Sequence, residues 1–220
     1  NSDYNKDFVK TYIEKGFSGI KLYPSLGYFP FDERMYGVYQ YAQTEQIPIM
    51  THCSAGGINY GSSENIYSIE NPLPFYKIPG KQYQFPLGDK KLGDYCDAMV
   101  SPEHYEEVFH EFPNLKLCFA HMGIDGDVNF RSSTQNGVGL SWYQYIMNMM
   151  LTYPNIYMDI SYTLSYDGFY QWFIQEYNKM PKHVQDRIMF GTDFFMTVQE
   201  LQGDDNIIYQ NAVKEQGSLL

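Results

Sequence analysis

The stretch SPEHYEEVFHEFPNLKLCFAHMG, residues 101–123, decides the fold because it holds one complete helix-to-strand repeat. It begins with Ser-Pro, an N-cap followed by a proline at the first helical position. Apolar residues then recur at the three- and four-residue spacing of a packed helix. Residues 115–120 are a short apolar run typical of a buried strand, and His121 follows directly. The stretch therefore predicts a helix, a strand and a histidine at the strand's C-terminal end.

The same repeat extends in both directions along the chain. Amphipathic segments predict helices over residues 4–15, 32–46, 139–152, 167–180 and 204–216. Short apolar runs predict strands over residues 19–24, 47–52, 156–160 and 188–191. Strands that alternate with helices form βαβ units and a parallel sheet, so the predicted fold class is α/β.

One connection is much longer than the others. A βα unit takes roughly 30 residues, and residues 53–100, rich in proline and glycine, exceed this between the strands at 47–52 and 115–120. The excess follows a strand's C-terminal end, where α/β proteins bind their ligands. We therefore interpret residues 1–220 as a single domain with an insert, 53–100, over the mouth of its site. Four tyrosines are candidates for the wall of that site: Tyr60, Tyr67, Tyr76 and Tyr83.

Composition restricts the class of partner. The 220 residues carry 15 Lys and Arg against 26 Asp and Glu, a formal charge of −11. This acidic balance disfavours nucleic acid and anionic membranes as partners, and the sequence has no apolar run long enough to span a bilayer. A hydrophobic content of 44% with 19% charged residues is typical of a globular domain. The expected partner is a small-molecule substrate.

The cysteines favour a reducing compartment. Three cysteines, an odd number without C-x-x-C spacing, are better explained as buried free thiols than as a disulfide framework. We therefore expect a cytoplasmic protein. Cys53 adjoins His52, but neighbours in a strand point to opposite faces, which argues against a Cys–His dyad.

Four ionisable residues stand at or just after the ends of predicted strands. They are Lys21, His52, His121 and Asp193, in the segments GIKLYP, IPIMTHC, LCFAHMG and IMFGTDFF. Parallel strands all point the same way, so a barrel gathers such residues at one mouth. Imidazole and carboxylate are ligands that Zn²⁺ or a similar divalent ion prefers. One histidine at a strand end is usually a core residue, whereas two histidines and an aspartate at three strand ends indicate a metal site.

These segments resemble the metal-dependent amidohydrolase superfamily, in particular its amidohydrolase-related, aminocarboxymuconate-semialdehyde decarboxylase-like branch. The matching segments, in family order as strands four to eight, are GFSGIKLYPS (16–25), IPIMTHCS (47–54), FPNLKLCFAHMG (112–123), YPNIYMDIS (153–161) and DRIMFGTDFF (186–195). The resemblance implies a (β/α)8 TIM barrel with a divalent-metal centre at its C-terminal mouth. This chain would then be a partial barrel of about five βα units that lacks the N-terminal strands.

The resemblance also implies a role for each residue. His52 matches the strand-five metal ligand, and His121 matches a histidine that binds a second metal or acts as acid, base or water-orienting group. Asp193 matches the strand-eight aspartate, which binds metal and can accept a proton from the attacking water. Lys21 matches the position of a carbamylated bridging lysine in some members. For Lys21, attraction of an anionic substrate is at least as good an interpretation as a carbamylated metal bridge.

The chain departs from the family pattern in one respect. The strand-one H-x-H pair is absent, because the five histidines stand at 52, 104, 110, 121 and 183. We expect His104, His110 and His183 to lie on the surface. We also expect a fragment of a longer polypeptide that is inactive alone, holds metal weakly or not at all, and associates with another copy. Asp159 and Ser161 share a strand face with Tyr157, and a structural or supporting role is favoured for them.

The leading function is a metal-dependent hydrolase, or a non-oxidative decarboxylase of the same branch. Its substrate would be a small anionic molecule, either a cyclic compound or an amide or ester. Its cofactor would be a divalent metal ion, with Zn²⁺ as the first candidate. The alternative is a non-catalytic barrel that binds a small molecule or a protein partner through residues 53–100. The missing H-x-H pair motivates this alternative.

Overall fold

The computed structural model describes seven stretches of the chain. They are residues 2–26, 28–54, 76–78, 81–83, 98–124, 141–163 and 169–193. The chain divides into two compact units, Asn1–Leu117 and Cys118–Leu220. Each unit is described by itself below.

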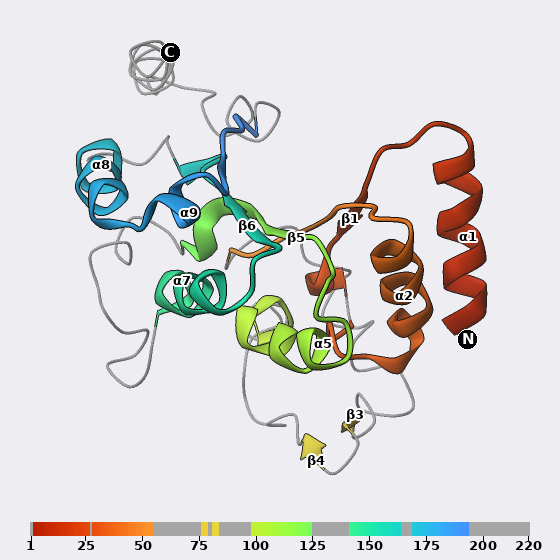
Figure 1. The fold of residues 1–220 in the computed structure, drawn as a ribbon. Helices are drawn as coiled ribbons and strands as arrows, with labels where there is room; N and C mark the ends of the chain where they lie inside the picture. Colours follow the sequence, from red (N-terminus) through yellow and green to blue (C-terminus); the bar gives the residue numbers. More distant parts are fainter. Residues whose placement is uncertain are drawn as a thin grey trace, which may run out of the picture. The chain divides into compact units, whose positions relative to one another are not determined.

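Five short strands form one sheet, in the order β1-β2-β5-β6-β7 (Figure 1). Their bounds are β1 Ile20–Leu22, β2 Ile49–Thr51, β5 Leu117–Phe119, β6 Ile156–Asp159 and β7 Ile188–Met189. The pairs β1–β2 and β6–β7 are parallel, with Lys21 opposite Met50 and Asp159 opposite Met189. The predicted α/β class is confirmed, and each predicted strand among the described residues is present, although shorter than its apolar run.

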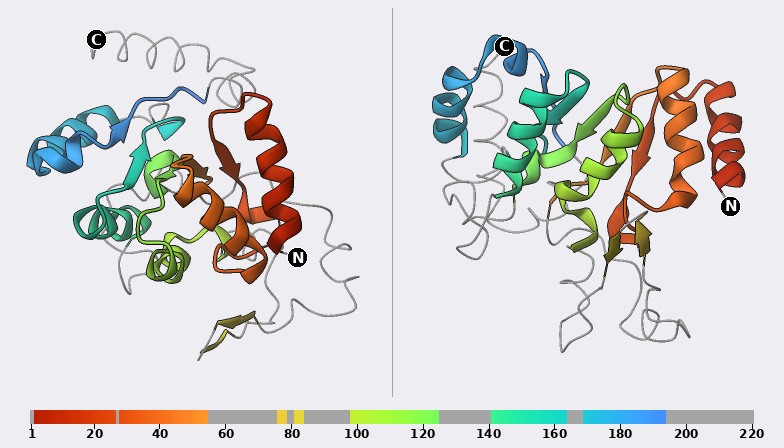
Figure 2. Two further views of the ribbon diagram at one scale, coloured as in Figure 1. Left: turned by 45° about the vertical axis from the view of Figure 1, so that its right-hand side comes forward. Right: turned by 60° about the horizontal axis from the view of Figure 1, so that its bottom comes forward.

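Two helices of the first unit lie side by side, as Figure 2 also shows. They are α1 (Ser2–Glu14) and α2 (Tyr36–Thr44). The Gly37 N–H donates to Ser2 Oγ over 2.6 Å, and Asn5 Nδ2 donates to the Arg34 carbonyl over 2.9 Å. Asp32 caps the short helix η2 (Glu33–Met35), which leads into α2, by accepting from the Arg34 N–H over 2.9 Å. The predicted cap is therefore confirmed, with one 3₁₀ turn before the α-helix.

The helix that follows Ser101 corrects one prediction. Helix η3 (Pro102–His104) leads into α5 (Tyr105–Glu111). Ser101 takes the N-cap position of η3, without a side-chain hydrogen bond. His104 was expected on the surface, but it is only 5% exposed. Its ring packs edge-on against Phe29 and Phe31, with centroids 5.0 and 5.3 Å away. The reason is that the chain after β1 brings these two phenylalanines over η3, and no periodic signal in the sequence encodes that contact.

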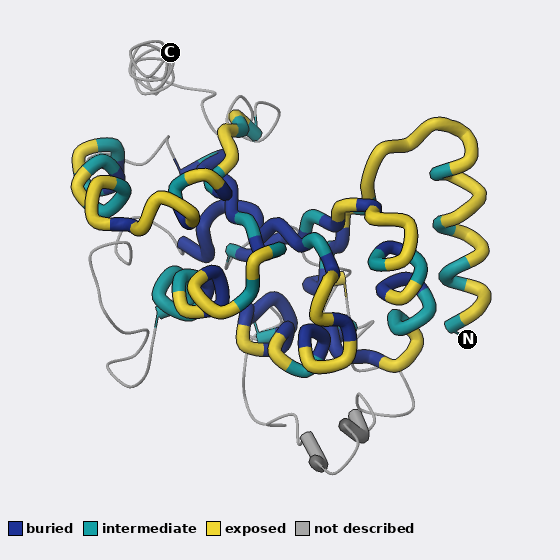
Figure 3. The backbone as a smooth tube through the Cα atoms, in the orientation of Figure 1, coloured by how far each residue is buried: buried dark blue, intermediate teal, exposed yellow. Residues whose placement is uncertain are grey.

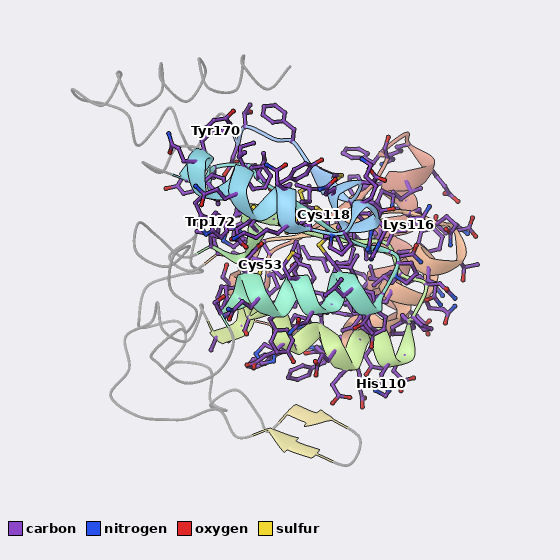
Figure 4. All side chains as sticks on the ribbon, turned by 60° about the vertical axis from the view of Figure 1, so that its left-hand side comes forward. Cys53, His110, Lys116, Cys118, Tyr170 and Trp172 are labelled. Atoms are coloured by element: carbon purple, nitrogen blue, oxygen red, sulfur yellow. The ribbon has the colours of Figure 1, made fainter. Side chains whose placement is uncertain are left out.

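The other two histidines behave as expected. His110 and His183 are both exposed, and Figure 4 shows His110 at the outer edge of α5. Cys53 and Cys118 are free and buried, which confirms the predicted state of these two thiols. Cys96 lies outside the described residues.

Three α-helices are described in the second unit, together with β6 and β7. They are α7 (Trp142–Thr152), which Ser141 and Gln144 start with a reciprocal capping box, α8 (Phe169–Lys179) and α9 (Lys182–Gln185). Buried residues concentrate on β5 and β6, as Figure 3 shows. Arg187, 8% exposed, donates four hydrogen bonds to the carbonyls of Met150, Tyr153, Ile156 and His183. This single side chain joins the C-terminal end of α7 to the start of β6 and to α9.

Two predicted features lie mainly or wholly outside the described residues. These are the helix over 204–216 and most of the insert over 53–100, including Tyr60 and Tyr67. Within the insert, β3 (Tyr76–Ile78) and β4 (Lys81–Tyr83) form an antiparallel pair. The lid role of the insert stays a prediction. Among the described helices, none has both the length and the apolar character that crossing a membrane requires.

Candidate functional site

The four predicted site residues fall into two pairs, one in each unit. Lys21 and His52 belong to the first unit, at β1 and just after β2. His121 and Asp193 belong to the second unit, after β5 and after β7. The two pairs are therefore described separately.

In the first unit, His52 is buried and held from several directions. It is 4% exposed, and its N–H donates to the Leu22 carbonyl over 3.0 Å, which continues the β1–β2 pairing by one residue. Its Nε2 lies 3.3 Å from Ser54 Oγ. The ring of Tyr23 stacks on the imidazole with centroids 4.2 Å apart and planes inclined by 12°. The imidazole of His52 thus has a fixed orientation at the end of its strand.

Tyr23 is itself anchored by a second tyrosine. The Tyr23 N–H donates to the phenolic oxygen of Tyr28 over 2.9 Å. Burial raises the pKa of Tyr28 to about 12, although its hydrogen bond with Tyr23 acts in the opposite direction. Tyr28 therefore stays neutral at physiological pH and can accept this bond without bringing a negative charge to the site.

Lys21 and Cys53 are close enough to interact electrostatically. Lys21 is exposed on β1, whereas Cys53 is fully buried. Burial raises the pKa of the Cys53 thiol well above its ordinary value, and the positive charge of Lys21 opposes that shift only in part. A thiol that stays protonated is a poor nucleophile. This supports the exclusion of a Cys–His dyad.

In the second unit, His121 stands in a left-handed turn. Three consecutive residues have positive φ: His121 at 64°, Met122 at 53° and Gly123 at 65°. The left-handed conformation costs roughly 1–2 kcal/mol for each non-glycine residue, so the surroundings must hold the turn. A Cβ on Gly123 would lie 2.8 Å from Ile146 Cδ1 and 2.9 Å from Trp142 Cβ. Glycine is therefore required where the turn meets α7.

One carboxylate oxygen holds the start of this turn. Asp159, 4% exposed at the end of β6, accepts three hydrogen bonds on Oδ1. They come from the His121 N–H at 2.9 Å, the Ser161 N–H at 3.0 Å and the Ser161 hydroxyl at 2.6 Å. Asp159 thus joins the exits of β5 and β6, a role that agrees with the supporting one expected for it and for Ser161.

Ser161 also contacts the ring of His121. Nδ1 of His121 lies 3.1 Å from the Ser161 carbonyl oxygen and 3.1 Å from Ser161 Oγ. Tyr162, in the left-handed region at φ 62°, sets its ring edge-on to the imidazole with centroids 6.0 Å apart. The sequence did not single out Tyr23 or Tyr162. Each is an aromatic residue one or three positions after a strand, a weak signal in a chain with 22 tyrosines.

Asp193 follows β7 in the second unit. It is half-buried, with a φ of 47°. Two residues earlier, Gly191 approaches Ser161 so closely that an added Cβ would lie 3.0 Å from Ser161 Cβ. The exits of β5, β6 and β7 therefore meet around Ser161, which brings the segment of Asp193 to the cluster that holds His121.

The donor types suit a divalent metal, although no three-donor cluster is formed in the described part of the chain. Imidazole and carboxylate are suitable ligands, and Nδ1 of His121 is engaged by the Ser161 carbonyl oxygen. A ligating histidine characteristically binds a carbonyl or carboxylate through its other ring nitrogen. Among the described residues, no group of three or more His, Cys, Asp or Glu side chains could hold a metal ion.

Comparison with known proteins supports the architecture. Residues 9–211 match the family described as Amidohydrolase. A search of curated protein sequences gives no significant match. Among solved structures, the chain is similar to an uncharacterized TIM-barrel protein from Bordetella bronchiseptica, with a TM-score of 0.51 and 17% identity. The alignment covers 95% of this chain and 61% of that one, so the chain spans about three fifths of the barrel protein.

Proposed function

Because the chain belongs to the amidohydrolase family, we propose that it is part of a metal-dependent hydrolase or non-oxidative decarboxylase. We place it in the aminocarboxymuconate-semialdehyde decarboxylase-like branch, with a small anionic substrate. The observation that carries the proposal is the imidazole of His121, which Ser161 holds through Nδ1 just after β5.

In this proposal, His52, His121 and Asp193 are the metal ligands. The support is topological: each follows a strand of one sheet, and parallel strands present their C-terminal ends at one edge. His52 and Asp193, with His121, would hold the ion through imidazole nitrogens and a carboxylate. When bound, a divalent ion supplies Lewis acidity, which activates a water or polarises a substrate oxygen.

The protein's own groups would move the protons and bind the substrate. Asp193 would accept the proton of the attacking water in hydrolysis. Where His121 does not bind the ion, its imidazolium form, protonated on both ring nitrogens, would stabilise the developing negative charge in hydrolysis, or protonate the carbon that loses CO₂ in decarboxylation. Lys21, which is exposed on β1, would attract the anionic group of the substrate. General acid–base assistance of this kind is worth roughly 10²–10⁴ in rate.

A substitution pair tests the role of Asp193. In the intact natural protein, Asp193→Asn keeps the side-chain shape and removes the proton acceptor, so kcat should fall at least about a hundredfold. The matched control is Asp186→Asn, because Asp186 is exposed and pairs with Lys182 over 2.7 Å on the surface. Near-normal turnover in Asp193→Asn would remove this aspartate from the mechanism.

Metal content and product analysis test the reaction class. Small carboxylated esters, amides and lactones would be assayed with and without added Zn²⁺, with acid release and CO₂ release followed separately. Zinc-dependent acid release indicates hydrolysis, and zinc-dependent CO₂ release indicates decarboxylation. A protein that binds no divalent metal and turns over nothing would favour the non-catalytic alternative.

A further inference from the structure

The hydrogen bonds around His121 define which ring nitrogen carries its proton. We propose that Asp159 and Ser161 are positioning residues that lock His121 as the Nδ1–H tautomer, in which the lone pair is on Nε2. The role of this tautomer in catalysis rests on the proposed function, whereas the assignment of the hydrogen to Nδ1 does not.

Two acceptors point at Nδ1, and each requires a hydrogen there. The Ser161 carbonyl oxygen, 3.1 Å from Nδ1, can only accept. Ser161 Oγ, also at 3.1 Å, has one hydrogen, which it donates to Asp159 Oδ1 over 2.6 Å. Toward the imidazole this hydroxyl is therefore an acceptor as well. A neutral histidine with hydrogen on Nδ1 has its lone pair on Nε2.

The order of the three side chains differs from that of a serine nucleophile. In a Ser-His-Asp triad the imidazole lies between hydroxyl and carboxylate, whereas here the hydroxyl of Ser161 lies between Asp159 and His121. Its hydrogen is directed at the carboxylate, and its oxygen accepts from the ring. Ser161 is thus assigned to orienting the imidazole rather than to attacking a substrate.

The backbone contributes to the same lock. The His121 N–H is held by Asp159, and the His121 carbonyl accepts from the Ile124 N–H over 3.0 Å. Gly123 closes the left-handed turn against α7. Strained backbone conformations of this kind persist only where several surrounding interactions hold them in place. Asp159 therefore sets both the backbone from which the imidazole projects and the hydroxyl that its Nδ1 meets.

The test is ¹⁵N NMR of the metal-free natural protein with labelled histidine, recorded at about pH 8, where ordinary imidazoles are neutral. His104 is the internal control, because its Nε2 lies 2.7 Å from the Ala98 carbonyl and must carry the hydrogen. The expected spectrum shows His121 protonated on Nδ1 and His104 on Nε2, with signals assigned through His121→Gln and His104→Gln. His121 protonated on Nε2 would overturn the proposal.

Three variants separate positioning from simple loss of structure. Asp159→Ala frees the Ser161 hydroxyl to donate to Nδ1, so the Nε2–H form of His121 should become readily detectable. Ser161→Ala keeps the carbonyl acceptor, so Nδ1–H should persist. The double variant removes the competing hydroxyl and should return His121 to Nδ1–H, a reversal that general disruption would not produce. An unchanged tautomer in a folded Asp159→Ala variant would overturn the role of Asp159.

The outcomes distinguish this proposal from the proposed function. If the Asp159 variants do not fold, the unsubstituted protein and Ser161→Ala still decide the tautomer. If His121 is protonated on Nδ1 in a protein that shows no turnover, the positioning role is supported and the proposed enzymatic function is contradicted. If His121 is protonated on Nε2 in an active enzyme, the proposed function is supported and the positioning role of Asp159 and Ser161 is contradicted.

Discussion

The ring of Tyr23 lies nearly flat on the imidazole of His52, with planes inclined by 12° and centroids 4.2 Å apart. Tyr23 follows β1 and His52 follows β2, so the parallel pairing of these strands brings the two rings together. Stacked aromatic pairs contribute about 0.5–1.5 kcal/mol beyond the area that they bury. The stack both shields His52 and fixes the plane in which its ring nitrogens lie.

Removing the ring of Tyr23 should therefore expose His52. We expect Tyr23→Ala to react several times faster with diethylpyrocarbonate at His52 than the natural protein does, measured by mass spectrometry of the peptide. Tyr23→Phe is the matched control, because it keeps the stacking ring and the backbone N–H that Tyr28 binds. Equal modification of His52 in all three proteins would contradict a shielding role.

Buried His104 should make stability depend on pH. Burial lowers its pKa below the ordinary 6.5, although the Ala98 carbonyl and the charge of Glu103 oppose that shift. The unfolded chain then binds the proton more readily than the folded one, so stability is present above pH 6.5 and is lost as the pH falls through the lowered folded pKa. The free energy of unfolding should decrease on acidification, and this decrease should be smaller in His104→Gln.

The control for His104 is the exposed histidine of the neighbouring helix. His110→Gln should show the same acid-induced loss as the natural protein, because an exposed imidazole keeps similar surroundings on unfolding. Urea unfolding at several pH values measures both variants. Identical pH profiles for His104→Gln and the natural protein would show that burial of His104 has no energetic effect.

Among the described basic residues of the second unit, Arg187 should be the most costly to replace. Its guanidinium donates to four carbonyls, at distances between 2.6 and 3.1 Å. Arg187→Met leaves buried acceptors unsatisfied, at about 1–3 kcal/mol each, so we expect at least about 3 kcal/mol lower stability by denaturant unfolding. Lys179→Met, which removes an exposed pair with Glu176, should change stability by less than about 1 kcal/mol. Similar losses in the two variants would contradict the joining role.

The strands and the residues at their ends could be predicted because both depend on local sequence. Each strand is an apolar run, and each candidate residue stands in or directly after such a run. The burial of His104 could not be predicted, because it depends on where Phe29 and Phe31 fold after β1. A histidine on the polar side of a helical pattern carries no sign of that contact.

The surroundings of His121 were predictable only in part. The sequence placed Asp159 and Ser161 on one face of their strand, which favoured a supporting role for both. It could not show that Asp159 holds the N–H of His121, because that bond joins residues 38 positions apart. Nor do the letters AHMG predict a left-handed turn, since two of its three positive-φ residues are not glycine.

The left-handed turn at His121 also bears on the order in which the chain acquires its structure. Met122 and His121 disfavour this conformation locally, and its supports, α7 and Asp159, come later in the chain. During synthesis from the N-terminus, the histidine therefore emerges well before the groups that orient it. Its geometry can therefore form only after β6 has emerged, and an interrupted chain that ends before β6 would carry His121 without its orientation.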